Sequence, residues 1–358
     1  MHSRNLISFG LATVLSVAIV IPAFAQTAAE TKDYQSIQDE RDQKKQKDLL
    51  ISFLKNYPTS SHRPKVDLDL ITLYYGDSDW ANVVKRGDAF AMEQAAADAK
   101  TKSLLFTLAM EGARRMNNLP KMTEFADKAL AANPNNVPVL STMARTLADN
   151  PPNDAAAKTA ALDKALGYAQ SAQKATKPET TSDEEWKGSQ ARLHGTLGLI
   201  YYTKSQWHEA GNELAEYLKT NPKDGLNQYR YGVAMYTQLQ QTLTNLQALN
   251  TEARALQAKG ENTNAYIPRL TQYQETFESQ RDIVIDAMAK AFAIGGSWSK
   301  QAKEILDPLF KSKNSTLDGV DAFINSKKAE LDALTPLPAP TVAPARGGPG
   351  GAGAGPGR

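Results

Sequence analysis

The stretch that decides the fold is ARLHGTLGLIYYTKSQWHEAGNELAEYLKTNPKD, at residues 191–224. Apolar residues recur in it at three- and four-residue steps on both sides of a polar turn, which predicts two amphipathic helices. Gly198 and Ala210 are small enough to let two antiparallel helices cross closely. Asn221 and Pro222 end the second helix, because proline cannot continue it. The stretch therefore predicts a tightly packed pair of helices.

The residues at the predicted crossing keep a fixed register, formed by Leu197, Gly198, Tyr201, Ala210, Leu214 and Pro222. Their spacing resembles that of a tetratricopeptide repeat, whose pattern is L-G-x2-Y, then A-x3-F, then P. His194 departs from the family pattern, which usually has Trp there, and Leu214 replaces Phe. The resemblance implies an all-α fold, an α-solenoid of antiparallel helix pairs.

Weaker copies of the same register extend over residues 26–178, which we interpret as N-terminal repeats. Trp80 and Trp207 each follow a short polar turn, so each is expected to begin the second helix of a pair and to pack there. Residues 179–190 are polar and indicate a linker or a capped helix start ahead of the strongest repeat.

Residues 191–296 combine that repeat with an extended helical hairpin near the C-terminus. Leucines recur at roughly heptad spacing from Leu239 to Leu256, which is too long a pattern for an ordinary repeat helix. A glycine-containing turn then leads into a return helix. Residues 297–334 are expected to form capping helices, and the Pro/Gly/Ala-rich residues 335–358 are expected to be a disordered tail.

Residues 1–25 are typical of an export signal. Arg4 gives the positive start, an apolar run follows, and the sequence AFA at 23–25 matches a cleavage site. Cleavage after Ala25 predicts a periplasmic or secreted protein of a bacterium, whereas an uncleaved leader would anchor the chain in the membrane. The polar stretch 27–47 is then expected to merge into one helix that ends near residue 58.

The composition argues against several functional classes. The chain contains no cysteine, which excludes disulfides and Cys-ligated metal sites. The formal net charge of +2 falls to +1 when the leader with Arg4 is removed, so nothing predicts nucleic-acid binding. His62, His194 and His208 are not spaced as a metal pair, and no phosphate-binding loop is present. We expect a protein without enzymatic activity and without a cofactor.

The resemblance also implies where a partner would bind, because the first helices of tetratricopeptide repeats line a concave groove. Arg at such positions can form bidentate contacts with carboxylates, and Tyr offers a rigid amphipathic surface. The partner would be an envelope protein or a peptide segment of one, and the chain a scaffold or adaptor. The candidate groove residues are Tyr75, Arg114, Arg115, Arg145, Arg192, Tyr202, Tyr229 and Tyr236.

Two other roles are compatible with the sequence. The long hairpin within 225–296 would make a homo-oligomer if it packed against a second copy of the chain. Alternatively, Tyr202, Tyr229 and Tyr236 would stack on a glycan or another small molecule, since aromatic rings bind sugars in this way.

Overall fold

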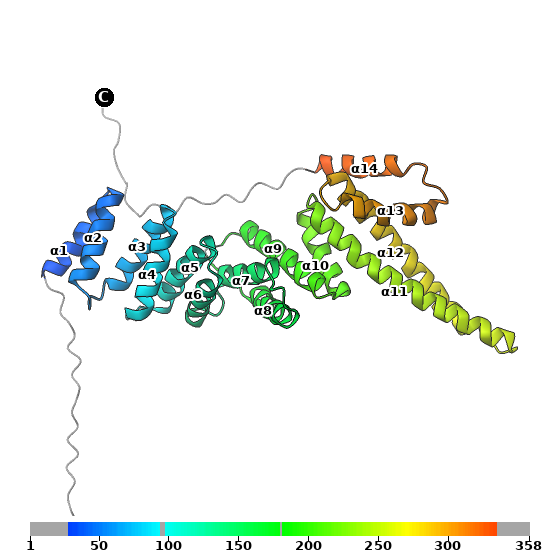
Figure 1. Ribbon diagram of the computed structural model, residues 1–358, viewed down its shortest axis with the longest axis horizontal. Helices are drawn as coiled ribbons and strands as arrows, with labels where there is room; N and C mark the ends of the chain where they lie inside the picture. Colours follow the sequence, from blue (N-terminus) through cyan, green and yellow to red (C-terminus); the bar gives the residue numbers. More distant parts are fainter. Residues whose placement is uncertain (1–27, 94–96, 180, 335–358) are drawn as a thin grey trace, which may run out of the picture. The chain divides into compact units, whose positions relative to one another are not determined.

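The computed structural model describes residues 28–93, 97–179 and 181–334, and within these ranges it contains fourteen α-helices and no strand (Figure 1). The predicted all-α fold is confirmed. The predicted export signal at residues 1–25 and the predicted tail at 335–358 lie outside the described residues. The helices are α1 Ala28–Asp39, α2 Gln43–Asn56, α3 Arg63–Gly76, α4 Trp80–Glu93, α5 Ala99–Arg115, α6 Leu119–Ala132, α7 Val137–Asp149, α8 Ala155–Lys174, α9 Asp183–Thr203, α10 Trp207–Thr220, α11 Gly225–Ala258, α12 Tyr266–Ile294, α13 Ser299–Asn314 and α14 Val320–Ala333.

The chain divides into two compact units, residues 1–128 and 129–358, which we call unit 1 and unit 2. Of the two alternatives given for residues 179–190, a linker or a capped helix start, residues 183–190 form the start of α9, which begins at Asp183. Ser182 and Glu185 form a capping box at this start, and both α7 and α8 pack against α9.

The first described residues of unit 1, 28–56, form two helices where the sequence predicted one, so that prediction is wrong. The interruption has a local cause, because the carboxylate of Glu40 accepts hydrogen bonds from the backbone N–H groups of Arg41 and Asp42. Asp42 then caps α2 by accepting from the backbone N–H of Lys45 at 2.9 Å. Ile37 of α1 is buried against α2 and α3, which gives the additional helix its place in the core.

Helices within each unit are joined by a recurring tight turn. Ser78, Asn117 and Ser205 have φ angles of 59°, 54° and 57° and follow α3, α5 and α9 respectively. Each turn has the two backbone hydrogen bonds of a Schellman motif; after α9 they run from Ser205 to Tyr202 and from Gln206 to Tyr201. Trp80 and Trp207 follow two of these turns directly and begin α4 and α10, as the sequence predicted.

The helix crossing predicted from residues 191–224 is present in unit 2. A Cβ atom on Gly198 of α9 would lie 2.7 Å from Cγ of Leu214 on α10, well inside van der Waals contact. The two helices therefore approach along the side that the glycine leaves open. The same device occurs in unit 1, where a Cβ on Gly87 of α4 would lie 2.5 Å from that of Ala109 on α5.

The extended hairpin is also confirmed, since α11 and α12 pack along each other and continue past α13 and α14 (Figure 1). Leu239, Leu249 and Ala253 are buried in the hairpin, and Thr242 donates a hydrogen bond to Gln280 at 2.8 Å. Helices α13 and α14 pack against α12, as capping helices would. None of the helices in the described ranges has the length and apolar composition needed to cross a membrane.

Candidate functional site

An aromatic pair stands at the turn between α3 and α4 in unit 1. Tyr75 lies in the last turn of α3, Trp80 is the first residue of α4, and their rings meet edge to face with centroids 5.3 Å apart. The turn at Ser78 sets this separation, because it reverses the chain within a few residues. Both aromatic side chains are partly exposed, so the pair offers apolar rings and polar ring atoms at the surface.

Two arginines of α5 join this pair. The Arg115 guanidinium lies 5.6 Å from the centroid of Trp80, within the range of a cation–π contact. Arg114 and Arg115 both contact Glu111, at 2.5 Å and 2.8 Å. Burial raises the pKa of the Glu111 carboxyl, but the hydrogen bonds from the two arginines outweigh it and leave that pKa below its usual value. One carboxylate thus faces two guanidinium groups, which leaves one positive charge in excess.

A close contact between α4 and α5 places these arginines. A Cβ on Gly112 of α5 would lie 2.5 Å from Cγ1 of Val83, so only glycine permits the approach. We name the group Tyr75, Trp80, Glu111, Arg114 and Arg115 the Trp80 cluster. It brings together three of the predicted groove residues, Tyr75, Arg114 and Arg115.

The same aromatic pair recurs in unit 2. Tyr202 lies in the last turn of α9 and Trp207 begins α10, with ring centroids 5.4 Å apart and an interplanar angle of 83°. Burial is the main cause that raises the pKa of the Tyr202 phenol, and nearby Tyr229 raises this pKa further. The hydroxyl group of Tyr202 therefore stays neutral near pH 7 and can donate a hydrogen bond.

Two arginines of unit 2, Arg145 and Arg230, lie near enough to affect each other electrostatically, and Tyr202 also acts on Arg230. Arg145 of α7 pairs with Asp149 at 2.5 Å, one helical turn along, and is half exposed. Arg230 of α11 donates to the side-chain oxygen of Asn227 at 3.0 Å. Burial is the main cause that lowers the pKa of the Arg230 guanidinium, and the positive charge of Arg145 lowers it further. We name the group Arg145, Tyr202, Asn227 and Arg230 the Arg230 cluster.

The sequence did not single out Arg230. In the repeat register it falls next to Tyr229 and outside the slots that were assigned to the groove. The sequence shows only an arginine one residue beyond a predicted slot, and it does not show that this arginine lacks a carboxylate partner. Knowing that it is half-buried, however, requires the packing of α11.

The remaining predicted groove residues are placed differently. Arg192 is exposed on α9. Tyr229 and Tyr236 are partly buried against the core that α11 forms with α12, α13 and α14. That core contains Val284, Ile285, Met288, Ala302, Leu306 and Phe310, among others. Much of each of these two tyrosines is therefore used in packing, which leaves less ring surface for a ligand than the sequence suggested.

The histidines make local contacts. The Nδ1 atom of His194 lies 2.6 Å from the carboxylate of Glu213, across the α9–α10 contact. The His62 ring stacks on Tyr34 with centroids 3.8 Å apart, and His208 contacts Asn212. Within the described residues, no group of three or more His, Asp or Glu side chains is arranged to hold a metal ion.

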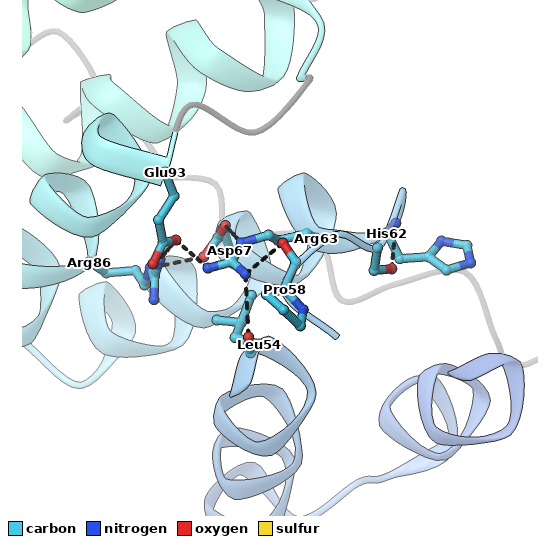
Figure 2. Close-up of polar contacts among 8 residues, drawn as sticks. Leu54, Pro58, His62, Arg63, Asp67, Arg86 and Glu93 are labelled. Atoms are coloured by element: carbon cyan, nitrogen blue, oxygen red, sulfur yellow. Dashed lines mark hydrogen bonds and ion pairs between the residues drawn. The ribbon is translucent and has the colours of Figure 1, made fainter. Parts of the chain in front are cut away.

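A buried charged network in unit 1 was not foreseen from the sequence. Asp67 of α3 has no exposed surface, and Figure 2 shows it between Arg63 and Arg86, with Glu93 beside both arginines. Arg86 Nε lies 2.8 Å from Asp67 Oδ1, and Arg63 Nε lies 3.9 Å from Asp67 Oδ2. Arg63 and Arg86 both also contact the Glu93 carboxylate.

The network links three helices of unit 1, namely α2, α3 and α4. Arg63 also donates to the backbone carbonyl groups of Leu54 at 3.3 Å and Pro58 at 3.0 Å, beyond its contacts with α3 and α4 (Figure 2). These carbonyl groups belong to the end of α2 and the loop that follows, where helix acceptors lack partners. Because Asp67 is enclosed, we assign this group to holding the fold and not to binding a ligand.

No protein family matches the chain, and no curated protein matches it significantly. The chain is similar to the solved structure of a tetratricopeptide repeat protein from Parabacteroides merdae, with 11% sequence identity and a TM-score of 0.38. The similarity covers 78% of this chain and 96% of that chain. A TM-score this low carries no conclusion about the fold or the function of the chain.

Proposed function

We propose that the chain is a non-catalytic adaptor that binds a protein segment in the bacterial cell envelope. The observation that carries the proposal is the Trp80 cluster, in which a partly exposed aromatic pair adjoins two arginines that share one carboxylate. Tyr, Trp and Arg are the side chains that most often dominate the energy of protein interfaces. The Tyr202–Trp207 pair repeats the aromatic part of this arrangement in unit 2.

The chemistry of the Trp80 cluster favours a segment that combines apolar and acidic side chains. The aromatic rings have few rotatable bonds, so little entropy is lost when they are covered. The excess positive charge favours a carboxylate, and an arginine can hold one through two parallel hydrogen bonds. The envelope location rests on the leader predicted at residues 1–25.

The test compares two charge-reversed variants. Arg114→Glu with Arg115→Glu reverses the charge of the Trp80 cluster, whereas Arg254→Glu with Arg269→Glu makes the same change at exposed positions of α11 and α12. Each tagged chain is used to capture proteins from solubilised envelopes. A captured protein is then purified, and its affinity for each variant is measured by tryptophan fluorescence.

The proposal requires that the first variant loses the partner and the second retains it, with unchanged helical circular dichroism in both. If both variants bind the purified partner as the unchanged chain does, the Trp80 cluster is not the site. If the leader remains attached in the mature protein, as mass spectrometry would show, the chain acts from the membrane.

A further inference from the structure

Arg230 differs from the other enclosed arginines of the described ranges in what surrounds it. Arg63 and Arg86 are at least as enclosed, and both contact carboxylates. Arg230 is half-buried, yet its side chain is held by a neutral amide, that of Asn227, and no ion pair to it is found among the described residues. A guanidinium removed from water usually has a carboxylate partner, because burying an unpaired charge is costly.

The nearby carboxylates are committed elsewhere. Asp224 caps α11 through the backbone N–H of Asn227 at 3.1 Å, and its second oxygen accepts from the Tyr217 hydroxyl at 2.8 Å. Asp149 pairs with Arg145. Both acids act on the charge of Arg230, but the opposing effect of Arg145 is larger than that of either. Neither acid forms an ion pair with Arg230, so within the described residues this guanidinium has no carboxylate partner of its own.

The orientation of Arg230 is fixed before any ligand arrives. The Asn227 amide nitrogen donates to Asp224 at 2.8 Å, which leaves its oxygen free to accept from Nη1 of Arg230. Asn227 itself is buried, so the amide is held in place. One edge of the guanidinium is thus bound to the protein, while its other N–H groups remain available to an anion.

We propose, on the basis of the interaction role proposed above, that Arg230, Arg145 and Tyr202 bind carboxylate side chains of an acidic segment of the partner. Two guanidinium groups on different helices can take up two carboxylates, which favours a segment with several acids over a single terminal carboxylate. Arg145 would exchange its exposed contact with Asp149 for the ligand, since exposed ion pairs contribute little to stability. The Tyr202 hydroxyl supplies a neutral donor beside them.

The experiment uses the full chain and three fluorescein-labelled peptides. One alternates Glu and Gly and has an amidated C-terminus; the second replaces every Glu by Gln; the third is the Gln peptide with a free C-terminal carboxylate. Binding is followed by fluorescence anisotropy. The expected result is binding of the Glu peptide, with no measurable binding of either Gln peptide.

The variants assign this binding to the cluster. Arg230→Met keeps the apolar stem and removes the charge. We expect it to lower the affinity for the Glu peptide by about tenfold or more, as loss of a charged hydrogen-bond partner does. Arg230→Lys keeps the charge but lacks the planar guanidinium, and it should lower the affinity by a smaller factor. If Arg230→Met unfolds, the affinity of Arg230→Lys still tests the assignment. Arg254→Met, on an exposed position of the same helix, should leave the affinity within about twofold.

Three outcomes would overturn the assignment. Unchanged affinity in both Arg230 variants would move the carboxylate site elsewhere. Binding of the free-carboxylate Gln peptide in place of the Glu peptide would make it a C-terminus receptor. If no peptide binds while the partner is still captured through the Trp80 cluster, the acidic-segment site is wrong and the adaptor role stands.

Discussion

Arg86 Nε lies 2.8 Å from Oδ1 of Asp67, a carboxylate that has no exposed surface. The contact is an ion pair without the alignment of a hydrogen bond, and neither oxygen of Asp67 has a hydrogen-bond partner. Burial therefore dominates over the attraction of Arg86 and Arg63, and it raises the pKa of Asp67 from 3.8 to about 6. A buried pair of this kind is weak evidence for stability.

The first prediction concerns the pH dependence that Asp67 brings. The folded chain binds a proton at the Asp67 carboxyl more tightly than the unfolded chain does, so protonation of Asp67 stabilises the fold. This stabilising contribution is fully present below pH 3.8 and is lost as the pH rises through about 6. A difference of about two pKa units corresponds to roughly 3 kcal/mol. Asn resembles the protonated acid, so Asp67→Asn should stabilise the chain at pH 7 by up to about 3 kcal/mol.

Urea unfolding of unit 1, followed by circular dichroism at several pH values, checks this prediction. The advantage of Asp67→Asn should shrink steadily as the pH is lowered from 7 to 4. If Asp67→Asn is instead less stable than the unchanged chain at pH 7, the two arginines hold the ionised carboxylate more strongly than burial opposes it.

The second prediction concerns His194, whose Nδ1 lies 2.6 Å from Glu213. The hydrogen bond to Glu213 raises the pKa of His194 above 6.5, against the opposing effect of burial. The protonated imidazole is thus favoured in the folded chain, so its stabilising contribution is present below pH 6.5 and is lost as the pH rises through the raised pKa.

Glu213→Gln removes the charge and keeps the size of the partner. We expect the His194 titration, measured by NMR of the imidazole ring, to move to lower pH in this variant, and the stability to become less dependent on pH above 6.5. The His208 resonance serves as an internal control, because it contacts Asn212 and not Glu213. An unmoved His194 titration would show that Glu213 does not hold the proton.

Much of the fold was predictable because it depends on local patterns. The register from Leu197 to Pro222 fixes a helix pair, and the polar turns ahead of Trp80 and Trp207 fix where second helices begin. The break between α1 and α2 was not predictable in this way. It depends on the carboxylate of Glu40, which accepts hydrogen bonds from two backbone N–H groups. The periodicity of the hydrophobic residues does not indicate such a contact.

The candidate site was predictable only in part, for a related reason. The repeat register indicates which positions face outward, and it brought Tyr75, Arg114 and Arg115 into one cluster. It does not report which charges are already paired. Glu111 forms ion pairs with Arg114 and Arg115, two of the predicted groove residues, whereas Arg230 has no carboxylate partner among the described residues. Both observations depend on contacts between side chains, which the sequence pattern does not show.

The third prediction concerns the left-handed residue after α9. Ser205 has a φ of 57°, a region that costs a residue with a Cβ roughly 1 kcal/mol compared with glycine. Ser205→Gly should therefore raise the stability of unit 2 by about 0.5–1 kcal/mol. Ser205→Ala is the matched control, since alanine keeps the Cβ and should bring no gain. Thermal unfolding of both variants distinguishes them, and equal midpoints would mean that the turn is not strained.

The last prediction tests the crossing of α9 and α10 against the intrinsic preference of a helix for alanine. A Cβ on Gly198 would lie 2.7 Å from Cγ of Leu214 and 3.3 Å from its backbone nitrogen, so Gly198→Ala forces the helices apart and should cost about 1–3 kcal/mol. Gly167 of α8 is exposed and has no atom within 4 Å of such a Cβ.

At Gly167 the effect should have the opposite sign, because alanine is favoured over glycine in an open helical position by about 1 kcal/mol. The two variants make the same chemical change in one unit, so urea unfolding of both separates packing from propensity. If Gly198→Ala also stabilised the chain, α9 and α10 would have room between them, and the reason for a glycine at the centre of the repeat would be lost.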